Sequence, residues 1–226
     1  MASRNIAIPI SKTRRNMSTE NTCSSKAVCL PAILLAAGAS NRLGQPKQLL
    51  RVESEMLLDH AVRVTRAAGF NPVFVVLGAH SDAIQRAAHL EGCTILINSG
   101  WSEGMASSIR CGVRAVQEQC SEASGVLLLV CDQPALTTEH LQTLLAAHCA
   151  APPAAIIASH YAGRPGVPIL APRLLFPQLL ALTGDRGARD FLRTDERELV
   201  EIPFISGEWD IDRPEDMAGD VTALSS

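Results

Sequence analysis

A loop after the first apolar segment gathers small residues and two cations. The small, apolar run Leu35–Gly38 is followed by Ser40, Arg42 and Lys47. Small side chains let backbone N–H groups approach an anion closely, and Arg and Lys supply charge for phosphate oxygens. The loop has neither the G-x-G-x-x-G spacing of dinucleotide-binding turns nor the adjacent Gly-Lys-Ser/Thr of a Walker loop. The residues indicate an anion-binding loop of another kind, and the alternative is a plain turn with two solvated cations.

A second candidate group is acidic. Asp132 directly follows the apolar run Val126–Val130. A carboxylate at the carboxyl end of a buried strand faces the crevice where open α/β sheets bind ligands, and its oxygens suit Mg²⁺. The alternative is that Asp132 caps a turn. Further along, Asp210 and Asp212 alternate on one side of a short extended segment, before residues typical of a helix start.

The elements that must position these groups alternate between strands and helices. Apolar runs predict strands at 28–36, 72–77, 94–97 and 125–130, and periodic patterns predict helices at 57–68, 81–88, 105–119 and 137–150. Strands at 154–159 and 167–170 are expected around a loop at 162–166, followed by helices at 172–182 and 187–194, a strand at 199–202 and a helix from 214. Strands that are apolar throughout predict a mostly parallel sheet with helices on both faces, a three-layer α/β/α architecture.

The composition restricts the class of protein. The 226 residues carry a formal net charge of -3, which argues against a dedicated nucleic-acid binder. No apolar run approaches the ~20 residues of a membrane helix. The seven cysteines are odd in number and form no C-x-x-C pair, which favours buried thiols in the reducing cytoplasm.

The N-terminal segment differs from the rest of the chain. Residues 1–26 hold five basic residues and one acidic residue and show no sustained apolar period. We expect a disordered basic tail over 1–26 and one domain over 27–226. The tail is either a solvated leader, an organellar presequence or a basic contact arm; without an apolar stretch it is not a secretory signal.

The loop pattern L-A-A-G-x-S-x-R-x-G-x-x-K resembles the N-terminal signature of the nucleotidyltransferase family that includes molybdenum cofactor cytidylyltransferases and guanylyltransferases. The resemblance implies a Rossmann-like fold of the nucleotide-diphospho-sugar transferase type. The A-A-G form is similar to the cytidylyl branch. C-D-Q-P at Asp132 resembles the metal-site motif of this family, and D-I-D-R-P-E-D resembles a second metal motif in which Arg213 replaces the usual Thr. The resemblance implies Asp132 and Asp212 as metal ligands, with Asp212 ranked above Asp210.

Two further motifs extend the resemblance. The stretch E-G-M-A-S-S resembles the family's nucleotide-proximal segment, and G-D-R-G-A-R resembles a motif of the cytidylyl branch. The nucleotide-binding residues implied are Leu35, Ala36, Ala37, Gly38, Ser40, Arg42, Lys47, Gly104 and Ser108. The catalytic residues implied are Lys47, Arg42 and Asp132, and the substrate-binding residues are Gly166, Pro168, Asp185, Arg186 and Arg189. Trp101, Trp209 and Tyr161 could frame a flat pterin ring.

The resemblance implies transfer of CMP from CTP to the terminal phosphate of molybdenum-bound molybdopterin, with release of pyrophosphate and with Mg²⁺ or Mn²⁺ as cofactor. An attacking phosphate is already an anion near neutral pH, so no general base is needed, which agrees with the scattered histidines. The alternatives are a transferase that uses GTP or a sugar phosphate, and a protein that delivers finished cofactor to an apo-molybdenum hydroxylase. No nucleic-acid or membrane partner is expected.

Overall fold

A seven-stranded mixed sheet forms the centre of the protein. The computed structural model describes residues 30–52, 54–188, 192, 198–211 and 216. The strand order is β5 (Thr94–Ile97), β4 (Val73–Leu77), β1 (Ala32–Ala36), β6 (Gly125–Val130), β8 (Arg164–Pro172), β7 (Ile156–Tyr161) and β9 (Leu199–Pro203). Neighbouring strands are parallel except at β8, which is antiparallel to both β6 and β7. The mostly parallel sheet predicted from the sequence is therefore confirmed.

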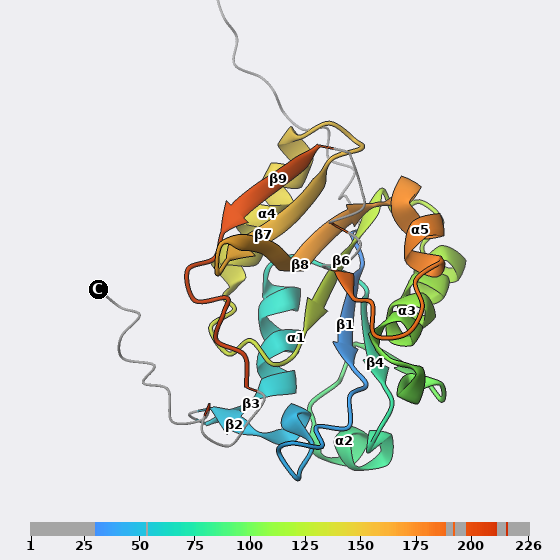
Figure 1. The fold of residues 1–226 in the computed structure, drawn as a ribbon, viewed down its shortest axis with the longest axis vertical. Coiled ribbons are helices and arrows are strands. Elements are labelled where there is room, and N and C mark those ends of the chain that lie inside the picture. The colour runs from blue at the N-terminus through green and yellow to red at the C-terminus, as the bar shows by residue number, and fades with distance from the viewer. Residues whose placement is uncertain (1–29, 53, 189–191, 193–197, 212–215, 217–226) are drawn as a thin grey trace, which may run out of the picture.

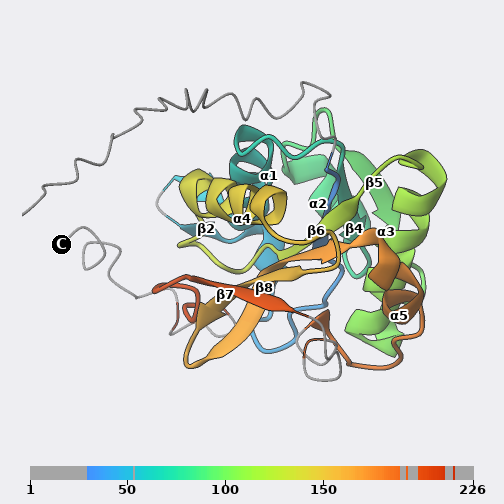
Figure 2. The same cartoon turned by 90° about the horizontal axis from the view of Figure 1, so that it is seen from above.

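Helices cover both faces of this sheet. Figure 2 shows α1 (Leu57–Ala67) and α4 (Thr138–Ala150) on one face and α3 (Met105–Gln119) and α5 (Phe176–Leu180) on the other, while α2 (Ser81–Ala87) follows β4 at one end (Figure 1). Strand side chains alternate between faces, so Leu34 packs with the residues of α1 and α4 and Ile33 with those of α3. Within the described residues, no helix combines the length and apolar character that a membrane span requires.

Element boundaries match the apolar patterns closely in the first 150 residues and less well afterwards. The predicted loop at 162–166 is wrong, because β7 and β8 form a tight hairpin around Ala162 and Gly163, both at positive φ. Gly166 therefore pairs with Ser159 within the sheet. The helix expected at 172–182 is shorter, comprising η3 (Arg173–Leu175) and α5. Most of the helix predicted at 187–194, and the final helix from 214, lie outside the described residues.

A polar cluster beneath α4 joins this helix to β7 and β8. Thr137 caps α4 by accepting the His140 N–H at 3.2 Å. His140 Nε2 lies 2.8 Å from Ser159 Oγ, whose hydroxyl donates to the Pro168 carbonyl at 3.0 Å. The imidazole must therefore be the donor to Ser159, and its ring stacks on Phe204 with centroids 4.3 Å apart. Burial lowers the pKa of His140 to about 4, so this histidine is neutral near pH 7.

We predict that His140→Gln makes the fold less sensitive to acid. The pKa of His140 is lowered from 6.5 to about 4 by folding. The unfolded chain therefore binds the proton first, and the free energy of unfolding falls as the pH decreases through this interval. In urea titrations at a series of pH values, the variant should lose less stability than the wild type between pH 6.5 and about pH 4.

His89→Gln is the control for this experiment. In the wild type, a hydrogen bond to Asp59 raises the pKa of His89. The contribution of His89 to stability is therefore present at acid pH and is lost as the pH rises. Replacing His89 should leave unchanged the decrease in the free energy of unfolding that occurs as the pH falls below 6.5. An equal acid-induced loss in the wild type and His140→Gln would show that His140 does not cause it.

Candidate active site

A cavity of about 450 Å³ lies beyond the carboxyl ends of β1 and β6. Its wall is formed by the loop after β1, by η1 (Lys47–Leu49), by η2 (Trp101–Glu103) with the first turn of α3, and by the end of β6. Carboxyl ends of parallel strands meet at one edge of a sheet, where loops from distant parts of the chain converge. The predicted site residues that line this cavity are Leu35, Ala36, Ala37, Gly38, Ser40, Lys47, Gly104, Ser108, Asp132 and Asp185.

Lys47 and Asp132 form an ion pair in this cavity. The Lys47 ammonium contacts Asp132 Oδ2, and the two side chains are only 19% and 14% exposed. The backbone N–H of Lys47 donates to Ser40 Oγ at 3.0 Å, which links the lysine to the loop after β1. Low exposure strengthens the attraction between opposite charges. The sequence predicted each of these residues separately, and the fold brings them into contact.

The surroundings of Asp132 fit a divalent cation. Asp132 Oδ1 is buried and has no hydrogen-bond partner among the described residues, and a buried anionic oxygen is costly unless it is paired. The Ile211 N–H donates to the Asp132 carbonyl at 3.1 Å, so the segment that carries Asp210 runs beside Asp132. Asp212, the predicted second ligand, lies outside the described residues. No group of three or more metal-binding side chains occurs in the described part of the chain.

The other predicted site residues that the structure describes do not line the cavity. Arg42 is exposed on the turn before η1, and Arg186 is exposed as well. Gly166 and Pro168 are buried within β8, because that strand begins at Arg164, inside the predicted loop 162–166, and includes the predicted strand 167–170. Arg189 lies outside the described residues.

The aromatic residues suggested as a frame for a flat ring are not grouped around the cavity. Trp101 lines it. Tyr161 is 4% exposed, packs edge-on against Phe204 and is hydrogen-bonded to Gln133. Trp209 donates from Nε1 to the Asp216 carbonyl at 3.1 Å and is not among the cavity-lining residues. Tyr161 is therefore a core residue rather than part of a binding surface.

Two buried glutamines, which the sequence analysis did not select, donate hydrogen bonds to backbone carbonyls of other segments. Gln48 Nε2 donates to the Ala36 and Gly38 carbonyls at 2.7 and 3.1 Å. Gln133 Nε2 donates to the Gly207 carbonyl at 2.9 Å, with the Tyr161 hydroxyl at 3.2 Å. Each glutamine directly follows one partner of the ion pair in the sequence. That position was the signal available, but only the fold identifies the acceptors.

The segment that carries Asp185 packs on the N-terminus of α3. The Ala106 N–H donates to the Gly184 carbonyl at 3.1 Å. Arg110 joins both sides, because its guanidinium pairs with Glu103 at 2.6 Å and donates to the Leu182 carbonyl at 2.7 Å. Gly104 has a φ of +121°, a conformation that side-chain-bearing residues avoid. These contacts bring Asp185 to the cavity.

The cavity lining offers charge rather than a nucleophile. Burial and, to a smaller extent, the nearby Asp132 raise the pKa of the Cys131 thiol to about 12, so this thiol stays protonated and unreactive. No histidine is found among the described residues that line the cavity. The chemistry available here is the binding of anions by Lys47 and by backbone N–H groups, and of a cation by Asp132.

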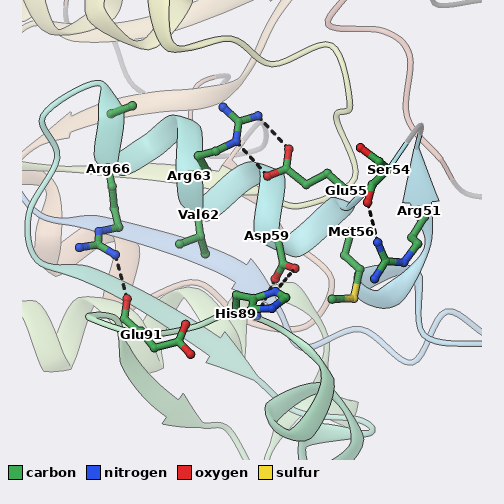
Figure 3. A pocket seen from close by; sticks show the side chains of 11 residues that line it. Arg51, Ser54, Glu55, Met56, Asp59, Val62, Arg63, Arg66, His89 and Glu91 are labelled. Carbon is green, nitrogen blue, oxygen red and sulfur yellow. Dashed lines mark hydrogen bonds and ion pairs between the residues drawn. The ribbon is translucent and has the colours of Figure 1, made fainter.

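A larger hollow, of about 880 Å³, lies between α1 and the hairpin of β2 (Arg51–Val52) and β3 (Glu55–Met56). Figure 3 shows that its cationic side chains are already engaged: Arg63 with Glu55, His89 with Asp59, Arg66 with the Glu91 carbonyl and Arg51 with the Ser54 carbonyl. None of the predicted site residues lines this hollow. We therefore assign the active site to the smaller cavity.

Comparison with known proteins finds a matching family and relatives of similar sequence. Residues 32–200 match the family described as MobA-like NTP transferase domain. The chain is 33% identical over 200 residues to the nicotine blue oxidoreductase of Paenarthrobacter nicotinovorans, with 84% of this chain and 95% of the relative covered. It is 29% identical over 190 residues to the molybdenum cofactor cytidylyltransferase of Escherichia coli, with 83% and 93% covered.

Solved structures support the same fold. Rv0371c of Mycobacterium tuberculosis, solved in complex with manganese, superimposes with a TM-score of 0.70 at 26% identity and covers 83% of this chain and 95% of its own. The Rossmann-like, nucleotide-diphospho-sugar transferase type of fold implied by the sequence is thereby confirmed.

We predict that Gly104→Ala destabilises the protein and displaces Asp185. A Cβ at this position would meet Asp185 Oδ1 and would lie 2.5 Å from the Gly184 carbonyl oxygen. The clash and the unfavourable φ together should lower the free energy of unfolding by about 2–4 kcal/mol, as measured by urea unfolding. Gly163→Ala is the matched control: its φ is also positive, at +70°, but no atom lies within 4 Å of the added Cβ. It should cost only about 1–2 kcal/mol, and equal losses in the two variants would contradict the proposed contact.

Proposed function

The chain belongs to the MobA-like NTP transferase family, and from this premise we propose that it transfers CMP from CTP to the terminal phosphate of molybdenum-bound molybdopterin. The products are molybdopterin cytosine dinucleotide and pyrophosphate. Nucleotidyl transfer is the activity of the family, whereas CTP and molybdopterin are the specific part of the proposal. The observation that carries it is the contact between Lys47 and Asp132 beside the small-residue loop.

Lys47 and the loop after β1 would hold the triphosphate. Lys47 presents an ammonium group at the cavity wall, and the small residues Ala37 and Gly38 allow phosphate oxygens to approach the backbone. We propose that Arg42 reaches the same phosphates from the exposed turn. The terminal phosphate of the acceptor would attack the α-phosphorus in line with the departing pyrophosphate. Positioning and charge neutralisation then account for catalysis.

Asp132 would hold the divalent cation, with Asp212 or Asp210 as the second acidic ligand. The ion, when bound, neutralises charge on phosphate oxygens. The buried oxygen of Asp132 without a partner supports this assignment, and a relative solved in complex with manganese supports the use of a divalent ion. We propose Mg²⁺ as the physiological ion and Mn²⁺ as a substitute.

The choice of CTP rests on the A-A-G sequence at Ala36, Ala37 and Gly38, and on the similarity to a named cytidylyltransferase. For the acceptor we propose Asp185, which lines the cavity, together with Arg186, Arg189, Gly166 and Pro168. A client apo-molybdenum hydroxylase and a cytoplasmic location belong to the same proposal. The five cysteines of the described residues form no disulfide with one another, in keeping with a reducing compartment.

A second candidate function follows from the relative named as an oxidoreductase. Its 33% identity over 200 residues makes redox turnover of a small molecule the competing activity. The loop of this chain has no dinucleotide fingerprint, and the paired Lys47 and Asp132 are suited to phosphates and a metal ion. Nucleotidyl transfer is therefore the better-supported function.

We predict that the protein releases pyrophosphate from CTP when molybdopterin and Mg²⁺ are present. The assay compares the four nucleoside triphosphates, each with and without molybdopterin. Release with CTP alone among the four supports cytidylyl transfer. Release with GTP instead would replace the nucleotide in the proposal, and release with none would contradict it and favour the redox candidate.

We also predict that Lys47→Ala lowers turnover by about 100-fold or more, because a charge that faces the developing negative charge on the phosphates is lost. Arg63→Ala is the control: it also removes a cation that pairs with a carboxylate, Glu55, but in the other hollow. This control should keep wild-type turnover. Circular dichroism and thermal unfolding should show that both variants are folded, and near-wild-type pyrophosphate release by Lys47→Ala would overturn its assigned role.

A further inference from the structure

We infer that Gln48 is a positioning residue that holds the loop after β1 in its anion-binding shape. The inference rests on the proposed nucleotidyl transfer, since it concerns the loop that would hold the triphosphate. Gln48 has a side chain that is 0% exposed, although it lies within the wall of the cavity. A fully buried amide at such a place needs a structural or functional reason.

The contacts of Gln48 determine the orientation of its amide group. Nε2 donates to the carbonyl oxygens of Ala36 and Gly38, at 2.7 and 3.1 Å. The opposite orientation would place Oε1 against two carbonyl oxygens, and all three would then be acceptors. Oε1 itself is buried and has no hydrogen-bond partner among the described residues. The hydrogen bonds that Gln48 makes with its side chain are therefore the two that its Nε2 donates.

These bonds control the direction of the loop's peptide groups. The Ala37 carbonyl, between the two that Gln48 binds, accepts the Ala79 N–H at 3.0 Å. Three successive carbonyl oxygens of the loop are thus bound by donors within the protein. In a trans peptide the N–H points opposite to the C=O, so fixing the Ala36 and Gly38 carbonyls directs the N–H groups of Ala37 and Ala39 away from Gln48. A phosphate approaching this loop is spared repulsion from three carbonyl oxygens and meets N–H groups that are already oriented.

Gln48 also connects the loop to the ion pair. It directly follows Lys47 in η1, and the Lys47 N–H is bound by Ser40 Oγ at the other end of the loop. The loop and Lys47 are therefore connected by hydrogen bonds through both Ser40 and Gln48. Loss of the amide would leave two carbonyls unbound and allow the loop to adopt other shapes, and part of the binding energy of the nucleotide would then be spent on ordering it.

The test compares Gln48→Met, which keeps the size of the side chain and removes the donor, with Thr65→Val. Thr65 is the matched control because it is also 0% exposed and donates to a backbone carbonyl, that of Ala61 at 2.6 Å, but within α1. Pyrophosphate release is measured against CTP concentration at saturating molybdopterin, together with the thermal unfolding temperature.

Gln48→Met should raise the KM for CTP by about tenfold or more, with a smaller change in kcat. Thr65→Val should lower the unfolding temperature and leave KM unchanged. An unchanged KM in Gln48→Met, or KM values that rise in both variants in step with lost stability, would overturn the inference.

Two further measurements keep the inference separate from the proposed function and from a folding failure. If wild-type turnover requires GTP, the comparison is made with GTP. If no nucleotide supports turnover, the binding of inorganic tripolyphosphate with Mg²⁺ is measured by calorimetry instead of turnover. Gln48→Met should then bind tripolyphosphate about tenfold more weakly than the wild type. In the wild type, the side-chain NH₂ protons of Gln48 should exchange slowly with solvent in nuclear magnetic resonance spectra before any nucleotide is added. Fast exchange would show that the loop is not held in advance.

Discussion

The ion pair between Lys47 and Asp132 is the contact on which the arrangement of the site depends. Its partners are 85 residues apart: Lys47 lies in η1, after the loop that follows β1, and Asp132 lies two residues beyond the end of β6. β1 and β6 are hydrogen-bonded neighbours in parallel orientation, so their carboxyl ends lie side by side at one edge. The low exposure of both side chains excludes much of the water that would otherwise screen the charges. Opposite charges are thereby held where a triphosphate and its cation would need them.

Each partner of this ion pair is held in place by polar contacts of its own backbone and by its sequence neighbour. The Lys47 N–H is bound by Ser40, and the Asp132 carbonyl accepts the Ile211 N–H. The neighbours Gln48 and Gln133 are buried, and they donate to backbone carbonyls at the end of β1 and at Gly207, respectively. Buried and satisfied donors of this kind cost less to keep ordered than exposed ones, and they reduce the reorganisation needed during the reaction. The rigidity of the site therefore comes from amide groups, while its chemistry comes from the charges.

The success of the sequence predictions varies along the chain for a physical reason. Central parallel strands such as β1, β4 and β6 are buried on both faces, so their apolar runs are continuous and easily read. The hairpin of β7 and β8 contains glycine and prolines that are typical of loops, yet cross-strand pairing extends β8 through Arg164, Pro165 and Gly166. Local composition indicated a loop there, and pairing with a neighbouring strand decided otherwise. Tyr161 was misjudged similarly, because burial against Phe204 is a tertiary property.

By itself, the sequence determined the α/β class, the small-residue loop and the identities of Lys47 and Asp132 as candidates, because residue type, spacing and strand periodicity are local properties. Only the tertiary structure decided that these two side chains touch, that Asp185 joins their cavity and that Arg42 does not line it. It also identified Gln48, since the value of a buried amide depends on which carbonyls it reaches, 10 and 12 residues earlier in the chain. Contacts of that kind depend on how the loop folds back over the end of the sheet, and spacing alone does not encode them.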